Sequence, residues 1–367
     1  MLIGIMKEPS GETRVSLLPE AVATLIGKGH TVFVESNAGA LAFASDEDYV
    51  KAGATIAHGQ QVIESSDILL SIHPEPVQHV HSKTLIGIYS PLFNTTSTAT
   101  FASQQNTVFS LDMLPRTTRA QSMDVLSSQA NIAGYKAVLL AATTYSRYLP
   151  MFMTAAGSIA PAKVLILGAG VAGLQAIATA RRLGAVVEVF DTRPSVKEEV
   201  QSLGAKFIEV EGAADASKAG GYAVEQSEEF KAKQQARIAE SAAKSDIIIT
   251  TAQIPGKKAP ILITQDMLNA MRKGSVIIDL AASTGGNTPL TQNNQTVMHN
   301  GITIIGNSNL PAMMPSDASK VYGKNIINFL QLITNGNGEF SLNLEDELVK
   351  GTCIMQAGNI IHERLSR

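Results

Sequence analysis

Cysteine, tryptophan and charged residues are scarce in this sequence. Its 367 residues include one cysteine, no tryptophan, 5% aromatic residues and 17% charged residues. The lone cysteine, Cys353, cannot form a disulfide within the chain, and its place in an apolar run predicts a small core residue. The lack of disulfides is typical of a protein in a reducing compartment.

A cluster of basic residues and a long apolar run are also missing. The 29 Lys and Arg against 32 Asp and Glu give a net charge of -3, which argues against nucleic-acid binding because phosphate contacts require clustered positive charge. The longest apolar stretch, residues 164–180, is broken by Gly168, Gly170 and Gly173, whereas a membrane helix needs about 20 continuous apolar residues. The N-terminal segment reaches charged residues too early for a signal peptide. We therefore expect no nucleic-acid partner and no direct membrane span.

What the sequence does contain is a repeated alternation of short apolar runs and helical patterns. A hydrophobic content of 45% with 29 glycines is typical of compact α/β proteins, and the length suggests about two domains. Because the apolar runs are continuous and rich in β-branched residues, they predict parallel strands covered on both faces. The predicted fold is α/β, with two Rossmann-like domains built on parallel sheets. The runs occupy residues 2–6, 31–36, 67–72, 84–90 and 107–112 in a first series, and 163–167, 186–190, 205–210, 246–251, 275–280 and 302–306 in a second.

Two predicted helices connect these series, over residues 116–135 and 316–333. The first helix lies between the series, and the second follows the last strand and could return the chain to the first domain. On this interpretation the first domain is discontinuous and comprises residues 1–126 and 314–367. The second domain comprises residues 127–313.

The helix predicted over 116–135 has an unusual polar face. From residue 125 to residue 135 it contains no Lys, Arg, Asp or Glu, although a solvated helix face usually carries several charges. A helix packed on both sides and a helix with a functional polar face are both consistent with this pattern. The apolar stripe consists of Met123, Leu126, Ala130, Ala133 and Ala137, and the polar stripe of Gln121, Asp124, Ser128, Asn131 and Tyr135.

A glycine-rich turn follows the first strand of the second series. Gly168, Gly170 and Gly173 have the G-x-G-x-x-G spacing between a predicted strand and a predicted helix, which is the fingerprint of dinucleotide binding. Asp191 ends the next strand about 20 residues on, where an acidic side chain binds a ribose 2'-hydroxyl and repels a 2'-phosphate. This favours NAD(H) over NADP(H), although the basic Arg193 argues in the other direction. The alternative is a purely structural turn, with Asp191 capping the next helix.

The sequence is poor in residues that could move a proton. A dehydrogenase acting on an alcohol or amine needs a general base beside the nicotinamide, but the seven histidines are scattered and several lie in loop-like stretches. We find no Ser-His-Asp arrangement and no paired carboxylates. His79 and His81 have no companion ligand nearby, so no metal site is expected. A hydride transfer that requires no proton suits this sequence better.

Several longer motifs resemble one family closely. They are very similar to the NAD(H)-binding component of proton-translocating nicotinamide nucleotide transhydrogenase, and the similarity extends from KEPSGETRVSLLP to GTCIMQAGNII. Alanine dehydrogenase is the related family that shares the fold. The motifs are RAQSMDVLSSQANIAGYKAV, AAGSIAPAKVLILGAGVAGLQAIATARRLGA, AGGYA, DIIITTAQIPGKKAP and GSVIIDLAASTGGN.

The resemblance implies a set of site residues. In the family, one cluster touches the nicotinamide end of the cofactor and faces an NADP-binding partner; its counterparts here are Arg116, Gln121, Asp124 and Ser127, with Tyr135 packed beneath. The adenosine and pyrophosphate contacts fall on Gly168, Gly170, Val171, Gly173, Asp191, Thr192 and Arg193. Gly221 and Tyr222 fall in a loop that closes over NADH in the family. Gln253 stands where the family usually has Leu.

Alanine dehydrogenase differs at its proton-handling positions. Its substrate-binding Lys falls at Ser71, its catalytic His near Ser90 and its catalytic Asp at Ser283 of this chain. Arg14 is shared by both families, and it is either functional or part of a structural ion pair.

The resemblance therefore implies direct hydride transfer between NADH held here and NADP+ held on a partner subunit, a reaction that requires positioning rather than acid-base groups. The uncharged polar stripe fits this role, because an unpaired buried charge would be costly at such an interface. Asp124 is the exception, and we expect a donor such as Arg116 or Gln121 beside it. Alternatives are an amino-acid dehydrogenase with rearranged catalytic groups and a non-catalytic NAD(H) sensor.

The resemblance also implies an assembly. We expect a homodimer that works with an NADP(H)-binding subunit and with a membrane-embedded subunit that translocates protons. The chain would then be cytoplasmic and peripheral, at the inner face of the cytoplasmic membrane.

Overall fold

A computed structural model describes residues 1–210 and 227–365. Contacts divide the chain into two compact units, Met1–Gln129 with Ala312–Arg367, and Ala130–Pro311. Both are α/β, and the first is discontinuous, as the sequence predicted. Within the described residues, no helix has the length and apolar character needed to cross a membrane.

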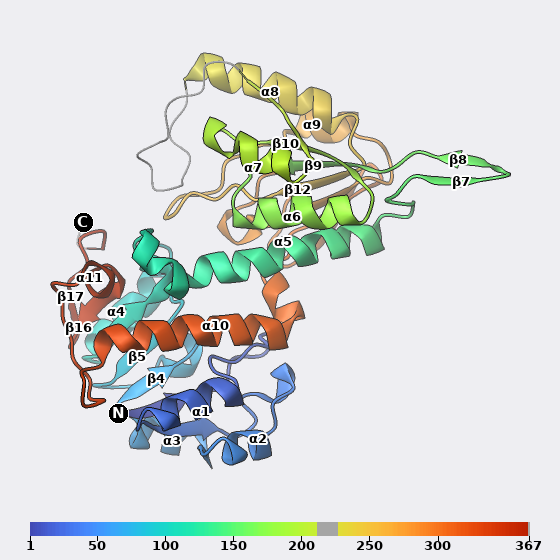
Figure 1. The fold of residues 1–367 in the computed structure, drawn as a ribbon. Coiled ribbons are helices and arrows are strands. Elements are labelled where there is room, and N and C mark those ends of the chain that lie inside the picture. Colours follow the sequence, from blue (N-terminus) through green and yellow to red (C-terminus); the bar gives the residue numbers. More distant parts are fainter. Residues whose placement is uncertain (211–226, 366–367) are drawn as a thin grey trace. The chain divides into compact units, whose positions relative to one another are not determined.

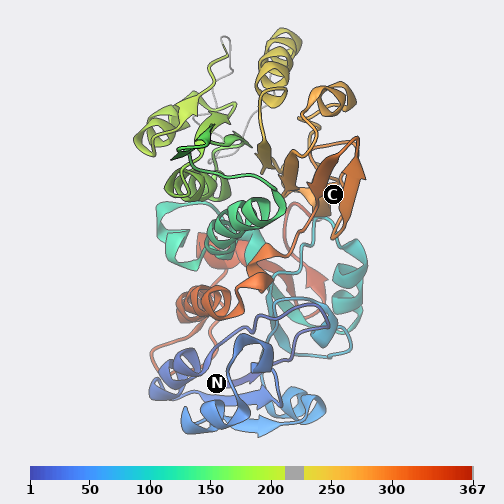
Figure 2. The ribbon, with the colours of Figure 1, turned by 90° about the vertical axis from the view of Figure 1, so that its right-hand side faces the viewer.

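The first unit is built on one sheet with the strand order β17-β16-β6-β5-β4-β1-β2-β3. Strands β1 to β6 pair in parallel, whereas β16 and β17 add an antiparallel edge. Figure 2 shows these C-terminal strands in red beside the cyan strands of the same unit. The strands are β1 Leu2–Ile5, β2 Thr31–Glu35, β3 Thr55–Ala57, β4 Ile68–Leu70, β5 Thr84–Gly87, β6 Thr107–Ser110, β16 Cys353–Gln356 and β17 Asn359–Ile360.

Helices cover both faces of this sheet because successive strand residues alternate between two cores. In β4, Ile68 and Leu70 join a core with α1 and α10, while Leu69 joins one with α3 and α4. The expected return helix is confirmed as α10, which ends in a short 3-10 helix. Cys353 is confirmed as a core residue, fully buried at the start of β16. The helices are α1 Pro19–Gly27, α2 Asp46–Lys51, α3 Gly59–Ser65, α4 Thr95–Ser103, α10 Pro315–Leu330 and α11 Glu347–Thr352.

The second unit contains a seven-stranded sheet with the order β11-β10-β9-β12-β13-β15-β14. Its edge strand β14 is antiparallel, and the other strands pair in parallel. Helices α6 and α7 cover one face, and α8 and α9 cover the other (Figure 1). The chain reverses its direction of progress across the sheet between β9 and β12, where doubly wound sheets bind ligands. The elements are β9 Lys163–Leu167, α6 Val171–Arg182, β10 Val186–Phe190, α7 Lys197–Ser202, β11 Lys206–Phe207, α8 Glu228–Ala242, β12 Ile247–Thr250, α9 Gln265–Ala270, β13 Val276–Asp279, β14 Thr296–His299 and β15 Ile302–Ile305.

The helix expected over 116–135 is shifted along the chain. A 3-10 helix, Thr118–Met123, comes first, and α5 then runs from Val125 to Thr144. The predicted apolar stripe was therefore wrong in part, because it started at a residue outside the α-helix. Leu126 of that stripe is 37% exposed. The buried positions of α5 are Val125, Gln129, Gly134, Ala137, Val138 and Ala141.

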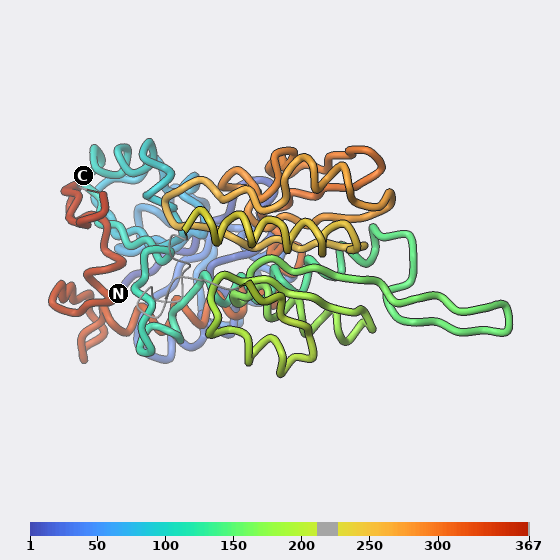
Figure 3. The backbone as a smooth tube through the Cα atoms, turned by 90° about the horizontal axis from the view of Figure 1, so that it is seen from above, coloured from blue at the N-terminus to red at the C-terminus, as the bar shows by residue number. Residues whose placement is uncertain are grey.

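A hairpin that the sequence analysis did not anticipate extends from the second unit. Its strands are β7 Phe152–Thr154 and β8 Gly157–Ile159, and Figure 3 shows it reaching beyond the other elements of that unit. Met151 and Met153 are 64% and 72% exposed. The Phe152 ring stacks on Tyr148 with ring centroids 4.9 Å apart. The hairpin thus presents apolar side chains that its own unit does not cover.

Candidate functional site

The three glycines after β9 serve three different steric purposes. Gly168 has a φ of +106°, a conformation that favours glycine. A Cβ on Gly173 would lie 1.9 Å from the Gly168 carbonyl oxygen, so α6 packs this closely only because residue 173 has no side chain. A Cβ on Gly170 would meet nothing within 4 Å. The second glycine therefore faces open space, which fits a position that admits a pyrophosphate.

The first turn of α6 follows this open position. Gly170 is the N-cap of α6, a helix of 12 residues, and Val171 in its first turn is 37% exposed. The N–H groups at a helix start have no partner within the helix, and the helix dipole favours an anion there. This geometry suits the diphosphate of a dinucleotide.

Asp191, just beyond β10, ties the glycine turn to the neighbouring strand. Its Oδ2 accepts a hydrogen bond from the Ala169 N–H at 2.7 Å. The Arg193 guanidinium donates to both carboxylate oxygens at 2.8 and 2.9 Å, and this hydrogen-bonded contact raises the pKa of Arg193. The alternative that Asp191 caps the next helix is wrong, because its oxygens bond the glycine turn and Arg193. Thr192 lies between the two charged residues.

A polar network that sequence reasoning missed joins the loops after β12 and β13. Asp279 and Asn287 are both fully buried, and the Asn287 amide hydrogen-bonds the backbone of residues 252 and 260. The motif GSVIIDLAASTGGN contains both residues, but no spacing rule connects them to the preceding loop. Gln253 is exposed, and its side-chain amide donates to the Leu280 carbonyl at 2.8 Å.

The residues that the resemblance assigned to the nicotinamide end belong to the first unit. Arg116 and Gln121 are exposed, and Asp124 and Ser127 are half-buried. The Asp124 carboxylate accepts from the Ser127 N–H at 2.9 Å and from the Ser127 hydroxyl at 2.6 Å. Ser127 is therefore a donor to Asp124 that the sequence analysis did not name. Asp124 acts as the N-cap of α5, which explains why that helix begins at residue 125.

Two members of the predicted polar stripe have partners within their own unit. Ser128 donates to the Asn325 Oδ1 on α10 at 2.8 Å. The Asn131 amide donates to Gln175 at 3.4 Å. Tyr135 is half-buried, next to Gly134, where a Cβ would lie 2.1 Å from the Ala172 carbonyl oxygen. Some of the uncharged stripe is therefore packing surface. Gly221 and Tyr222 lie outside the described residues.

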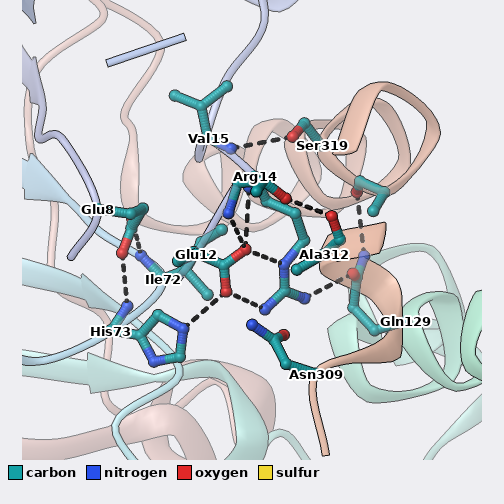
Figure 4. A network of polar contacts seen from close by, with 12 residues as sticks. Glu8, Glu12, Arg14, Val15, Ile72, His73, Gln129, Asn309, Ala312 and Ser319 are labelled. Atoms are coloured by element: carbon teal, nitrogen blue, oxygen red, sulfur yellow. Dashed lines mark hydrogen bonds and ion pairs between the residues drawn. The ribbon is translucent and has the colours of Figure 1, made fainter. Parts of the chain in front are cut away.

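Arg14 forms a buried ion pair rather than an open anion site. It is 6% exposed, and its guanidinium donates to both oxygens of Glu12 at 2.9 and 2.7 Å (Figure 4). It also donates to Gln129 at 2.8 Å. Of the two interpretations of Arg14, the structure supports the ion pair.

Two more ionisable groups complete this network in the first unit. The His73 Nε2 lies 2.8 Å from Glu12. Burial opposes ionisation of Glu12, but hydrogen bonds from Arg14 and His73 hold its pKa well below the usual range. Glu8 accepts from the N–H groups of Ile72 and His73 at 2.5 and 3.1 Å. Burial raises the pKa of Glu8 to about 7.

The positions to which the resemblance assigns the ionisable groups of alanine dehydrogenase hold hydroxyls here. Ser71 is fully buried, with its Oγ 3.1 Å from the Tyr89 hydroxyl. Ser90 has a φ of +48°, and Ser283 is exposed. Burial keeps the Tyr89 phenol protonated by raising its pKa. Neither Ser71 nor Tyr89 offers a base near neutral pH.

Comparisons with known proteins agree along the whole chain. Two family models match, Alanine dehydrogenase/PNT, N-terminal domain, over residues 4–133 and Alanine dehydrogenase/PNT, C-terminal domain, over residues 137–363. A protein of Rhodospirillum rubrum, named as the first portion of NAD(P) transhydrogenase subunit alpha, is 44% identical over 380 residues, which cover 100% of this chain and 99% of that protein.

Solved structures give the same result. A transhydrogenase from Sinorhizobium meliloti has a TM-score of 0.88 and 42% identity, with 98% of this chain and 100% of that chain covered. An L-alanine dehydrogenase has a TM-score of 0.82 and 25% identity, with 100% and 98% covered. The chain therefore belongs to the alanine dehydrogenase/PNT family and, within it, to the alpha subunits of NAD(P) transhydrogenase.

Proposed function

We propose that this chain holds NAD(H) in a transhydrogenase and passes hydride directly between NADH and an NADP+ bound by a partner subunit. The observation that carries the proposal is the pairing of a dinucleotide turn with serines at positions 71, 90 and 283. The turn fits a pyrophosphate at Gly170, and the serines supply no proton acceptor. A reaction between two nicotinamides needs none.

The second unit supplies the dinucleotide contacts in this proposal. Gly170 and Val171 lie where a diphosphate meets the start of α6, with Gly168 and Gly173 shaping the turn. Asp191 and Thr192 bind the adenosine ribose, and Arg193 holds the Asp191 carboxylate in place. NAD(H) is preferred because Asp191 disfavours a 2'-phosphate. Gly221, Tyr222 and Gln253 complete the cofactor contacts.

The first unit supplies the residues that face the nicotinamide and the partner. Arg116, Gln121, Asp124 and Ser127 fill this role in our proposal, and Tyr135, which belongs to the second unit, supports the same end of the cofactor. NADH supplies the hydride when bound, and the protein side chains only orient and shield the reacting ring. Ser127 holds the Asp124 carboxylate through two hydrogen bonds, so its orientation is fixed before any cofactor binds.

The proposal includes further subunits. The name of the Rhodospirillum rubrum relative describes it as a portion of an alpha subunit, which implies other components. We propose an NADP(H)-binding subunit and a membrane-embedded subunit that couples the reaction to proton translocation. This chain would then be cytoplasmic and peripheral, at the inner face of the cytoplasmic membrane.

Substitutions at Gln121 and Asp124 test the assignment of hydride transfer. We expect Gln121→Asn and Asp124→Asn to slow exchange between NADH and an NADP analogue at least tenfold, with a purified NADP-binding component present. The Kd for NADH should change less than threefold, because neither residue belongs to the dinucleotide turn. Asn is as good an N-cap as Asp, so α5 is retained.

The control variant is Gln60→Asn, an exposed glutamine of α3, which should exchange hydride at the wild-type rate. Normal exchange by both test variants would contradict the assigned roles. Alanine-dependent reduction of NAD+ by this chain alone would instead establish an amino-acid dehydrogenase. Tight NADH binding without exchange would establish a sensor.

We also propose that the chain forms a homodimer through the β7–β8 hairpin. Met151, Phe152 and Met153 are exposed there, and a second copy would remove this apolar surface from water. Met153→Glu should shift the sedimentation equilibrium from dimer to monomer. Met298→Glu is the matched control, since Met298 is 65% exposed on strand β14 of the same unit. A Met153→Glu protein that remains dimeric would exclude the hairpin as the interface.

A further inference from the structure

A buried asparagine links two loops at the carboxyl ends of β12 and β13. The two strands pair in parallel, with Thr250 beside Asp279 at their last residues. The loop after β13 returns Asn287 to the loop after β12, and the Asn287 side chain is fully buried there. Because water cannot reach this buried amide, its hydrogen-bond partners must come from the protein.

Among the described residues, the side-chain hydrogen bonds of Asn287 all go to one short segment. Its Oδ1 accepts from the Ala252 N–H at 3.2 Å. Its Nδ2 donates to the carbonyl oxygens of Ala252 at 2.9 Å and Pro260 at 2.8 Å. The amide therefore holds both ends of residues 252–260. A residue without both a donor and an acceptor at this point could not hold them.

Asp279 fixes the backbone of Asn287 in turn. Its Oδ2 accepts from the Asn287 N–H and from the Thr291 hydroxyl, both at 2.6 Å, and its Oδ1 accepts from the Ala281 N–H at 2.9 Å. These donors compensate for burial of the carboxylate. Gly286 permits the tight turn between them, since it has a φ of +77° and a Cβ there would lie 2.9 Å from Asp279.

The segment held by Asn287 begins beside the glycine turn. The Thr251 N–H donates to the Leu167 carbonyl at 2.9 Å, and its hydroxyl donates to the Gly168 carbonyl at 3.2 Å. Ala252 is the next residue. In a doubly wound sheet, one half binds the adenosine and the other half binds the second nucleotide. Asp191 marks the half with β9 and β10 as the adenosine side, so residues 252–260 belong to the nicotinamide half.

We infer that Asn287 is a positioning residue for the nicotinamide half of the cofactor, acting through residues 252–260. This inference rests on the proposed function. Asn287 does not touch the cofactor in this scheme. The Asn287 side chain fixes the backbone of residues 252–260 at the carboxyl end of β12. Asp279 in turn fixes the backbone of Asn287.

The test compares binding of NADH with binding of ADP-ribose, which lacks the nicotinamide. The variant Asn287→Leu keeps a similar volume and removes all side-chain hydrogen bonds to residues 252–260. We expect the Kd for NADH to rise at least tenfold and the Kd for ADP-ribose to rise less than threefold. Calorimetry measures both, and NADH fluorescence provides a second measurement because the chain has no tryptophan.

Asn106→Leu is the matched control. Asn106 is also fully buried, donates to the Val80 carbonyl at 2.7 Å and accepts from the Lys83 N–H at 3.0 Å, but it lies in the first unit. Its loss should lower the unfolding midpoint without changing either Kd. Should Asn287→Leu fail to fold, Asn287→Asp serves in its place with Asn106→Asp as its control. The aspartate keeps an acceptor for Ala252 but turns an oxygen toward two carbonyl groups.

Three results decide the matter. A selective loss of NADH affinity supports the inference. Unchanged NADH affinity, or equal losses for NADH and ADP-ribose, overturns it while the proposed function stands. A wild-type protein that binds neither ligand refutes the proposed function, and the inference with it.

Discussion

The buried carboxyl of Glu8 should make the first unit less stable as the pH rises. Glu8 is 8% exposed, and burial raises its pKa from 4.5 to about 7 in the folded protein. Between these pH values the folded protein holds a proton that the unfolded chain has lost, so the free energy of unfolding falls as the pH rises. About one pH unit above the folded pKa both states are ionised and the loss is complete.

The size of the effect follows from the two pKa values. One pKa unit corresponds to about 1.4 kcal/mol, so the free energy of unfolding should fall by roughly 2–3 kcal/mol between pH 5 and pH 8 because of Glu8. Glu8→Gln removes this titration. The neighbouring His73 and Glu12 are present in both proteins, so the difference between wild type and variant reports the titration of Glu8 together with its coulombic coupling to these two residues.

Urea unfolding followed by circular dichroism at pH 5, 6, 7 and 8 measures this difference. The variant should gain roughly 2–3 kcal/mol relative to wild type over that range, whatever its stability at pH 5. Glu345→Gln, an exposed glutamate of the same unit, should follow the wild type at every pH. Parallel curves for wild type and Glu8→Gln would refute the reasoning, because they would mean that burial does not keep Glu8 protonated.

Two further substitutions separate binding from folding at the glycine turn, and a third tests the ion pair of the first unit. Gly170→Ala should leave the unfolding midpoint unchanged but weaken NADH binding at least tenfold, because its methyl group enters open space; calorimetry and thermal unfolding check both. Gly173→Ala should lower stability by roughly 1–3 kcal/mol, since its Cβ would overlap the Gly168 carbonyl; an unchanged midpoint would contradict this. Glu12→Ala should cost roughly 3–5 kcal/mol in urea unfolding at pH 7, because it leaves the buried Arg14 guanidinium without its carboxylate. A loss below about 1 kcal/mol would argue against that pairing.

The sequence predicts the geometry of the glycine turn well because its determinants are local. Gly168, Gly170 and Gly173 lie within one turn and the start of one helix, and their steric roles follow from their spacing alone. Asp191 lies one strand further on, at a distance that the strand and helix lengths determine. Even so, the hydrogen bonds of Asp191 to Arg193 and to the Ala169 N–H could not be predicted from the sequence, because they depend on side-chain orientation.

The start of α5 was harder to predict. Periodicity alone cannot show that residues 118–123 form a 3-10 helix, since their composition is also compatible with an α-helix. Asp124 stops the α-helix from extending further back because its carboxylate occupies the Ser127 N–H. The predicted polar stripe treats Asp124 as a member of one helix face, whereas this residue also serves as a cap. A cap of this kind is recognisable as a local Asp-x-x-Ser pattern.

Contacts between distant segments could not be predicted at all. Glu12 neutralises Arg14 two residues on, but His73 and Gln129 join them from elsewhere in the sequence. Asn287 meets residues 252 and 260 only because β12 and β13 are neighbours. Hydrophobic patterns identify strands and helices, but they do not specify which loops lie together at a sheet edge.

The discontinuity of the first unit affects how this protein folds during translation. Residues 130–311 are synthesised as one continuous stretch that contains all strands of their sheet. In the first unit, by contrast, β6 cannot pair with β16 until more than 200 further residues have been synthesised. At about 5–20 residues per second, that wait is on the order of ten seconds or more. During that interval β6 is an unpaired sheet edge, which favours misassembly, so newly made chains should depend on chaperones until β16 has been synthesised.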